Sequence, residues 1–290
     1  NDYSGTSIRT FLNPVTQDVF EPGSVFKVIT MAAGIDSGAI TPLTTYNDMG
    51  KLVLNGKTIR NWDLEAHGVM TMTNVLEKSL NTGAAFAEMK TGNDTFLSYL
   101  KKFGLGEKTG IDLLGEAKGN LSGMTATHAP QIAFATASFG QGVAVSMIEL
   151  VNAFSVIANG GTLMRPYVNA ALEPQEVRRV VSKDTADKVT AMMVSALDKA
   201  EIAKVNGFLL AGKTGTAQIP DLVHGGYYED KVIDSYAGFG PTSDSRFVIL
   251  IKLADPEGAP LAGTTVVPAF RELAQFILNY YHLTPDNLPQ

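Results

Sequence analysis

The feature that most constrains this chain is an apolar helix with a lysine in its first turn. Within FEPGSVFKVITMAAGI (residues 20–35), Pro22 and Gly23 predict a turn, and Ser24 stands at the expected N-cap. The apolar residues that follow cover nearly the whole circumference of the helix, which predicts that it is buried. Lys27 is out of place there, because burial and the positive end of the helix dipole both penalise its charge.

Chemistry offers a reason for a buried lysine three residues after a serine. At this spacing the side chains of Ser24 and Lys27 share a helix face and can touch. Burial favours a neutral amine, which can take the hydroxyl proton and make the serine a nucleophile. Backbone N–H groups at the helix start can stabilise an oxyanion. The alternative is that Ser24 only caps the helix and Lys27 extends to solvent.

Length and composition indicate a globular protein. The chain has 290 residues, 45% hydrophobic and 18% charged, enough for a sizeable core in one large or two small domains. The net charge of −6 and the lack of a basic cluster argue against nucleic-acid binding. No apolar run approaches the roughly 18 residues that cross a membrane, and the polar start NDYSGTS is no signal peptide. We therefore expect a fragment whose targeting segment lies outside the residues given.

The residues that usually bind metals give no indication of a metal site. Cysteine is absent, which excludes disulfides, thiol catalysis and cysteine-ligated metals. The histidines are scattered without the paired spacing of ligands. They are His67, His128, His224 and His282.

The order of predicted elements indicates an α/β fold. Residues 38–57 read as turns and short strands, and residues 71–160 as mostly helical. One helix is expected to start at Thr73 or Asn74 and to break near residues 81–83. Ser146 and Glu149 form a capping box for another.

The second half predicts an antiparallel sheet. An extended run (162–172) and a helix capped by Ser182 precede three strand-like runs with short links (208–219, 232–240 and 245–254), and an amphipathic helix follows (266–281). The simplest interpretation is a single domain, residues 1–290, with an antiparallel sheet covered by helices. A mostly helical region, roughly 24–160, is then inserted into an α/β region of roughly 1–23 and 161–290.

A second polar signal lies at the expected helix break. In KSLNTG, Ser79 and Asn81 are two residues apart, so both can face a cleft. A hydroxyl there can relay a proton, and an amide can hold a substrate carbonyl and amide together. The alternative is an ordinary turn.

A third polar signal interrupts a strand. In AGKTGTAQ (residues 211–218), Gly215 removes a side chain and would let an extended peptide approach the strand edge. Lys213, Thr214 and Thr216 would offer a cation and hydroxyls to a terminal carboxylate. The alternative is a hairpin strand with solvated polar residues.

The three signals together resemble a known family. S-x-x-K, S-x-N and K-T-G in this order resemble the penicillin-recognising serine acyltransferases. More narrowly, the chain looks like the transpeptidase domain of class B penicillin-binding proteins over residues 13–281, including SFGQGVAVSMIELVNAFSVIANGG and SYAGFGPTSDSRFVILIKLADPEG. The resemblance implies the penicillin-binding transpeptidase fold, with the active site between the two regions, and acyl transfer without metal or organic cofactor.

The resemblance also implies catalytic roles. Ser24 would be the acylated nucleophile and Lys27 its base, while Ser79 would relay the proton to the leaving group. The backbone N–H groups of Ser24 and Thr216 would form the oxyanion hole.

Substrate binding is implied for the remaining motif positions. Asn81 would hold the acyl-donor peptide, and Lys213 and Thr214, beside Gly215, would support proton relay and carboxylate binding. The substrate would be a peptidoglycan stem peptide ending in D-Ala-D-Ala, and β-lactams would acylate the same serine.

The resemblance implies a setting for the whole protein. It would work at the extracytoplasmic face of the bacterial cytoplasmic membrane, anchored by an N-terminal helix absent from this chain. A membrane glycosyltransferase and divisome or elongasome proteins would be its partners. The first strands of the sheet and a pedestal-like region would precede the residues given.

A nucleotide-binding protein is the competing class. GFLLAGKT (residues 207–214) fits the P-loop pattern, and FVILIKLAD ends in an acid, Asp255. A P-loop needs a helix immediately after it, whereas Gly215 and Pro220 in GTAQIP oppose one.

Two alternatives keep the fold: a β-lactam sensor and a β-lactamase. A β-lactamase on this fold needs a second base to activate the deacylating water, such as the glutamate that class A enzymes carry in an E-x-x-L-N segment, and we expect no such base here. ELVN at Glu149 is one residue short, and capping explains its glutamate better.

Overall fold

The main sheet is a meander of three antiparallel strands. The computed structural model describes residues 11–200, 202–221, 223–258 and 261–286. The strands are β9 (Ala211–Pro220), β10 (Tyr227–Gly240) and β11 (Phe247–Ala254), in the order β11-β10-β9. Ala237 in β10 pairs with Lys213 in β9 and Leu250 in β11. The predicted antiparallel meander is confirmed, and within the described residues β9 is an edge strand of this sheet.

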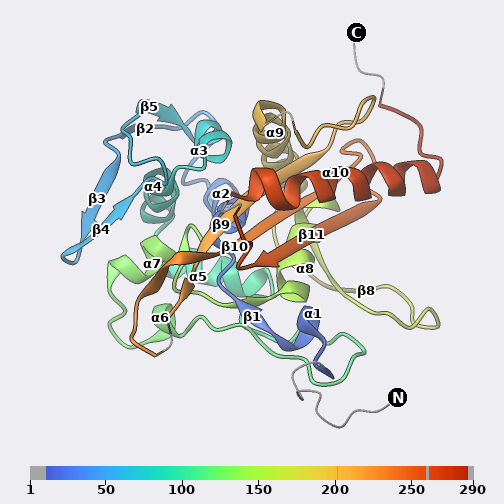
Figure 1. Ribbon diagram of the computed structural model, residues 1–290, viewed down its shortest axis with the longest axis horizontal. Coiled ribbons are helices and arrows are strands. Elements are labelled where there is room, and N and C mark those ends of the chain that lie inside the picture. The colour runs from blue at the N-terminus through green and yellow to red at the C-terminus, as the bar shows by residue number, and fades with distance from the viewer. Residues whose placement is uncertain (1–10, 201, 222, 259–260, 287–290) are drawn as a thin grey trace.

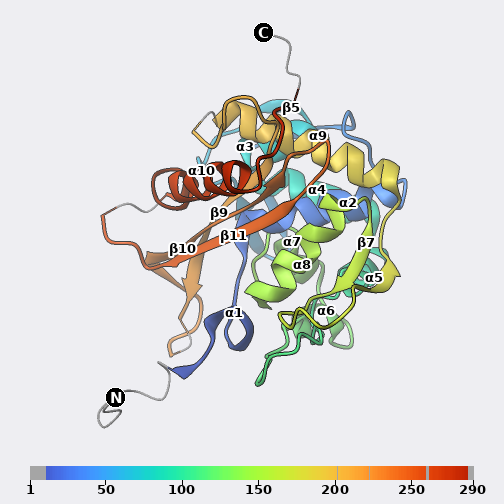
Figure 2. The ribbon, with the colours of Figure 1, turned by 90° about the vertical axis from the view of Figure 1, so that its right-hand side faces the viewer.

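Helices cover both faces of this sheet (Figures 1 and 2). Helix α10 (Ala262–Tyr280) packs on one face and α8 (Met147–Ala158) on the other, where α9 (Lys183–Ala200) contacts both α8 and β9. The buried rings of Tyr236 on β10 and Phe270 on α10 have centroids 4.4 Å apart. Burial of such rings holds a helix on a sheet, and the expected sheet flanked by helices is confirmed.

The helical region surrounds one fully buried helix. Every residue of α2 (Lys27–Asp36) from Lys27 to Ile35 is buried, and α2 contacts α4, α5 and α9. This confirms the burial predicted from its apolar circumference. The other helices before the sheet are α1 (Pro14–Gln17), α3 (Met72–Lys78), α4 (Asn81–Thr91), α5 (Asn93–Lys102), α6 (Ser122–Thr125) and α7 (Gln131–Ala137). Among the described helices, none has both the length and the apolarity needed to cross a bilayer.

Short strands follow the buried helix, as predicted. β2 (Thr45–Asp48) pairs with β5 (Gly68–Thr71), and β3 (Lys51–Leu54) pairs with β4 (Lys57–Arg60), both in antiparallel fashion. The helical region is therefore not purely helical. We refer to residues 45–71 as the 45–71 segment; its strands project beside α3 and α4 (Figure 1).

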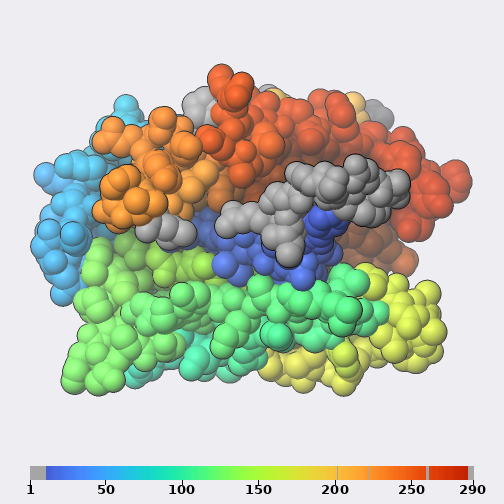
Figure 3. Space-filling view, turned by 60° about the horizontal axis from the view of Figure 1, so that its bottom comes forward, coloured from blue at the N-terminus to red at the C-terminus, as the bar shows by residue number. Residues whose placement is uncertain are grey.

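The start of the described chain lies between the helical region and the main sheet. β1 (Val19–Phe20) pairs with β6 (Val145–Ser146), not with a strand of the main sheet. Figure 3 shows this dark-blue stretch between the green segments on one side and the orange and red segments on the other. The assignment of residues 1–23 to the α/β region stays a prediction: Lys252 Nζ on β11 also contacts Asp18 Oδ2 at 3.1 Å, and residues 1–10 lie outside the described residues.

Two predicted helix caps are confirmed. Glu149 N donates to Ser146 Oγ at 3.2 Å, and Ser146 N donates to Glu149 Oε2 at 2.7 Å, which completes the capping box of α8. Ser182 caps α9, since Thr185 N donates to its Oγ at 3.1 Å. The extended run before α9 forms a hairpin, in which β7 (Thr162–Arg165) pairs with β8 (Gln175–Arg179).

Ser24 does not occupy the N-cap expected for it. The turn before α2 is a short 3₁₀ helix, η2 (Gly23–Phe26), and α2 begins at Lys27. Ser24 therefore lies inside a helical turn and makes no capping bond. Its hydroxyl remains available for chemistry.

The predicted helix break lies earlier than expected. Helix α3 begins at Met72, behind a capping box of Thr71 and Asn74, and the chain breaks at Ser79 rather than at residues 81–83. Asn-Thr-Gly reads as a turn, but these residues open helix α4. Gly83 is needed in that helix because a Cβ there would collide with Val75. This tertiary contact overrides the local preference for a turn.

Candidate active site

Ser24 and Lys27 form a close pair beside a cleft between the helical region and strand β9. Lys27 Nζ lies 2.8 Å from Ser24 Oγ, and the lysine side chain is 0% exposed. Ser24 is only partly buried and lines the cleft. The alternative in which Lys27 extends to solvent is therefore wrong.

The surroundings of Lys27 orient its lone pair toward the serine. Its Nζ lies 2.7 Å from the backbone oxygen of Ser79 and 2.8 Å from Asn81 Oδ1, and both oxygens can only accept hydrogen bonds. A neutral amine has two N–H donors, and these oxygens take both. The lone pair is then left to accept the proton of Ser24 Oγ, which is what activation of a serine requires.

Burial favours the neutral form of both lysines in the site. It holds the pKa of Lys27 well below its ordinary value, and the charge of Lys213 lowers that pKa further. Burial also lowers the pKa of Lys213 to about 7. Neither amine has an ion-pair partner among the described residues. At neutral pH Lys27 can thus act as a base, while Lys213 is protonated in part of the molecules.

Ser79 lies between the two amines. Its Oγ is 3.2 Å from Lys27 Nζ and 3.0 Å from Lys213 Nζ. The residue ends α3 in the left-handed conformation, with φ 58° and ψ 43°, which is strained for a serine. The chain reversal at this residue brings its hydroxyl and its carbonyl oxygen to the same amine. A hydroxyl in this place can pass a proton from a lysine to a bound group.

Asn81 is fixed from both sides of its amide. Its Oδ1 accepts from Lys27, and its Nδ2 donates to the backbone oxygen of Arg60 at 2.8 Å. The two bonds together define which way the amide faces. The structure therefore gathers Ser24, Lys27, Ser79 and Asn81 into one hydrogen-bonded cluster, as the sequence predicts.

The hydroxyls of the third motif differ in what they can offer a ligand. Lys213 Nζ donates to Thr214 Oγ1 at 3.3 Å, and within the described structure the O–H of Thr214 has no acceptor. Thr216 Oγ1 instead donates to buried Asp234 Oδ1 at 2.9 Å and accepts from Ala262 N at 3.3 Å. The expectation that the Thr216 hydroxyl serves a carboxylate ligand does not hold in this arrangement, because its one proton is already committed.

Gly215 has a different purpose from the one expected. A Cβ at this position would lie 2.5 Å from Ser235 Oγ, 3.0 Å from the backbone oxygen of Pro22 and 3.2 Å from Val25 Cγ1. The space beside Gly215 is thus occupied by protein rather than open to a ligand. The glycine lets β9 pack closely against η2, which carries Ser24.

The cleft also contains residues that the motifs do not reveal. Its volume is about 520 Å³. Besides the motif residues, its lining includes Trp62, Glu77, Phe139, Gln141 and Leu261. Glu77 lies two residues before Ser79, and Phe139 and Gln141 lie in the SFGQG stretch, whereas Trp62 and Leu261 come from segments that the motifs do not include. The described residues contain no cluster of three or more His, Asp or Glu side chains able to hold a metal ion.

The fold argues against two competing interpretations: a P-loop at Lys213 and Thr214, and Glu149 as the base of a β-lactamase. After Lys213 and Thr214 the chain continues as strand β9 to Pro220, whereas a P-loop would continue as a helix. Glu149 is buried away from the cleft, and its carboxylate accepts from the backbone N–H groups of Ser146, Gly106 and Gly119. It therefore acts as a capping and packing group.

Comparisons with known proteins agree with this geometry. The family model of the penicillin binding protein transpeptidase domain matches residues 1–275. The chain belongs to this family. This transpeptidase domain is 32% identical to penicillin-binding protein PbpB of Mycolicibacterium smegmatis, over 97% of this chain and 47% of the relative. It is 29% identical to peptidoglycan D,D-transpeptidase FtsI of Escherichia coli, over 99% of this chain and 48% of the relative. It thus spans less than half the length of either relative.

Solved structures share the fold of this transpeptidase domain. The apo transpeptidase domain of Burkholderia pseudomallei penicillin-binding protein 3 gives a TM-score of 0.86 at 30% identity, covering 97% of this chain and 85% of that one. Penicillin-binding protein 3 of Mycobacterium tuberculosis, complexed with aztreonam, gives 0.83 at 30% identity, covering 94% and 66%. The resemblance to class B penicillin-binding proteins and the expected fold class are confirmed.

Proposed function

We propose that this chain is the catalytic domain of a peptidoglycan D,D-transpeptidase that works through a serine acyl-enzyme. The observation that carries the proposal is the buried Lys27, whose lowered pKa and committed N–H groups leave a lone pair 2.8 Å from Ser24 Oγ. We further propose that residues 1–290 act as a single domain, with the helical region and the sheet forming the two sides of the cleft.

The first half-reaction forms the acyl-enzyme. Lys27 takes the proton of Ser24 while Oγ bonds to the carbonyl carbon of the penultimate D-alanine of a stem peptide. The bond to the terminal D-alanine nitrogen then breaks, and Ser79 passes the proton from Lys27 to that nitrogen. The backbone N–H groups of Ser24 and Thr216 stabilise the intermediate oxyanion. The products are free D-alanine and an ester on Ser24.

The second half-reaction transfers the acyl group. The amine of a neighbouring stem peptide attacks the ester carbonyl, and Lys27 or Ser79 accepts the proton that the amine loses. The bond to Ser24 Oγ breaks, and the serine recovers its proton. An amide cross-link forms, and the enzyme returns to its starting state.

The donor peptide binds along the sheet side of the cleft. Because β9 is an edge strand in the described sheet, an extended peptide can add to it as a further strand. The terminal carboxylate meets the protonated fraction of Lys213 and the free O–H donor of Thr214. Asn81 holds the peptide from the opposite side.

The setting of the whole protein is also a proposal. We place it at the extracytoplasmic face of the bacterial cytoplasmic membrane, held by an N-terminal helix outside these residues. A membrane glycosyltransferase and divisome or elongasome proteins are the partners. This part rests on the family resemblance alone.

Treatment with a β-lactam tests the proposal and separates it from the alternatives. We expect a transpeptidase to be trapped. The one literal match to E-x-x-L-N, EKSLN (residues 77–81), overlaps the second motif, and its Glu77 already accepts hydrogen bonds from Asn74 Nδ2 at 2.8 Å and Ser195 Oγ at 2.5 Å, while Glu149 is engaged in capping. With a large excess of nitrocefin we expect a burst of about one equivalent, followed by very slow hydrolysis. Sustained turnover would assign the protein to the β-lactamases. Acylation by D-Ala-D-Ala peptides without transfer to any amine would assign it to the β-lactam sensors.

A further inference from the structure

The 45–71 segment binds the backbone and side chains of the break between α3 and α4. The backbone oxygen of Arg60 accepts from Asn81 Nδ2 at 2.8 Å. Trp62 Nε1 donates to the backbone oxygen of Lys78 at 3.0 Å. Two residues of this segment thus hold both ends of the break that carries Ser79.

Asn61, between Arg60 and Trp62 in the sequence, continues this contact inside the protein. Its Oδ1 accepts from the backbone N of Thr82 at 3.3 Å and lies 3.1 Å from Thr82 Oγ1. Thr82 lies in the first turn of α4, where backbone N–H groups lack partners within the helix. The side chain of Asn61 is 1% exposed and that of Thr82 is 6% exposed. The register of the 45–71 segment against α4 is therefore set by buried hydrogen bonds.

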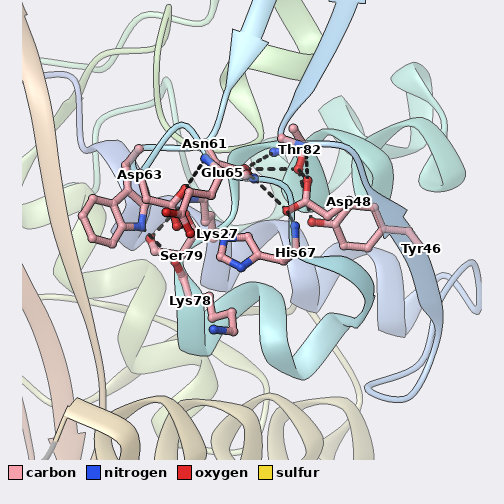
Figure 4. A network of polar contacts seen from close by, with 12 residues as sticks. Lys27, Tyr46, Asp48, Asn61, Asp63, Glu65, His67, Lys78, Ser79 and Thr82 are labelled. Carbon is pink, nitrogen blue, oxygen red and sulfur yellow. Dashed lines mark hydrogen bonds and ion pairs between the residues drawn. The ribbon is translucent and has the colours of Figure 1, made fainter.

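A buried carboxylate fixes Asn61 in turn. Asp48 is 1% exposed, and its Oδ2 accepts from Asn61 Nδ2 at 2.8 Å and from His67 N at 3.3 Å. Its Oδ1 accepts from Thr82 Oγ1 at 2.7 Å and from Gly50 N at 3.0 Å. Figure 4 shows Asp48, Asn61 and Thr82 pointing toward one another, next to Ser79 and Lys27. Hydrogen bonds to a charged group are stronger than neutral ones, so this network is rigid.

The orientation of the Asn81 amide decides whether Lys27 can act on the serine. With Oδ1 toward Lys27, the amide accepts an N–H and leaves the lone pair of the amine for Ser24. With the amide rotated, its NH₂ group would face the amine and occupy that lone pair. The backbone oxygen of Arg60 prevents the rotation, because it needs a donor from Asn81.

We propose that Asp48 and Asn61 are positioning residues that set the rate of acylation of Ser24. They hold Arg60 and Thr82 in register, so that Asn81 faces Lys27 with its oxygen. This role rests on the proposed function, since it concerns the same serine. It assigns the 45–71 segment, which contains none of the three motifs, to the catalytic machinery as its support.

The test replaces Thr82, which takes part in the network but is not in the cleft lining. Thr82→Val keeps the shape and removes the hydroxyl that donates to Asp48 and contacts Asn61. With a fluorescent penicillin, the acylation rate at saturation should fall by about ten- to a hundredfold, as small misplacements of catalytic groups do. The half-saturating concentration should stay within about twofold, because the ligand contacts remain.

Matched variants separate positioning from general damage. Thr82→Ser restores the hydroxyl and should restore the rate, whereas Thr58→Val makes the same change at an exposed site on β4 and should have no effect. Thermal unfolding of each variant shows that the rates belong to folded protein. Should Thr82→Val not fold, Trp62→Phe removes the indole N–H that binds Lys78 and should lower the saturating rate in the same direction.

The outcomes distinguish this role from the proposed function. A folded Thr82→Val that is acylated at the wild-type rate overturns the positioning role and leaves the proposed function intact. Equal losses in Thr82→Ser and Thr82→Val also overturn it, because the hydroxyl is then not the cause. A wild-type protein that no penicillin acylates overturns both.

Discussion

The two sides of the cleft hold their functional groups by different means. The helical wall presents Ser79 and Asn81 at a break between helices, where side-chain hydrogen bonds from the 45–71 segment fix them. The sheet wall presents Lys213 and Thr214 on β9, where backbone pairing with β10 fixes them: Lys213 pairs with Ala237, and Thr214 with Tyr236.

This difference implies unequal sensitivity to substitution. Backbone pairing does not depend on side-chain identity, so the sheet wall keeps its geometry when its side chains change. Side-chain bonds are lost with a single replacement, and the unpaired buried partner then costs free energy. The helical wall is therefore the side whose geometry one residue can change, and its network is centred on Asp48.

The largest effect on the acylation rate should appear when each lysine of the site is replaced by arginine in turn. Lys27 binds the helical wall and Lys213 belongs to the sheet wall. Arginine stays protonated, so Lys27→Arg removes the base and should lower acylation by about 100- to 10,000-fold. Lys213→Arg keeps a charge for the substrate carboxylate and should lose much less. Rates of labelling by a fluorescent penicillin measure both, and near-normal acylation of Lys27→Arg would mean that Lys27 acts only through its charge.

The second-largest effect should be a dependence of the unfolding free energy on pH, which Lys213 on the sheet wall causes. The folded protein lowers the pKa of Lys213 to about 7, so between pH 7 and 10 the unfolded chain binds more protons than the folded protein. Stability should therefore rise with pH in this window, with a contribution of about 3 kcal/mol from one such lysine between pH 7 and 9.5.

Urea titrations of wild type and Lys213→Met measure this contribution. The variant should show a smaller rise between pH 7 and 9.5, because Lys27 still contributes in the same direction. An unchanged rise in the variant would show that the Lys213 amine keeps its charge in the folded protein.

The smallest effect should come from a buried acid behind the helical wall. Glu88 on α4 is 0% exposed; its Oε2 accepts from Gln131 Nε2 at 2.8 Å, and its Oε1 has no partner among the described atoms. Burial raises the pKa of Glu88 to about 7. Its favourable contribution is thus complete below its ordinary pKa of 4.5 and is lost as the pH rises through 7.

Glu88→Gln tests this sign, which is opposite to that of Lys213. Relative to wild type, the variant should gain about 2 kcal/mol of unfolding free energy on going from pH 5 to pH 7, because it has no carboxylate to ionise. Glu272→Gln, on the exposed side of α10, is the matched control and should change little. A relative stability of Glu88→Gln that is the same at both pH values would place a partner at Glu88 that the structure does not show.

The sequence predicts the parts of the site that depend on local spacing. Three residues on a helix bring Ser24 and Lys27 together, and a lysine on an apolar helix already indicates burial and a lowered pKa. The meander and the helix caps follow from patterns of the same short range. The family resemblance adds the prediction that the three motifs line one cleft.

Contacts between distant segments explain what the sequence could not predict. The bond from Thr216 to Asp234 and the packing of Gly215 on Pro22 depend on how the sheet lies against η2. The network that joins Asp48 to Thr82 spans 34 residues. From the sequence alone, Asp48 would be interpreted as a turn residue, so its place in this network could not be predicted.

The most direct test of the account is to locate the penicillin adduct by intact mass and peptide mapping. The central claim is that Ser24 alone is activated, because Lys27 turns its lone pair to this hydroxyl and not to that of Ser79. The account predicts one adduct, on the peptide that contains Ser24, and none in Ser24→Ala. An adduct on Ser79, or covalent labelling of Ser24→Ala, would contradict it.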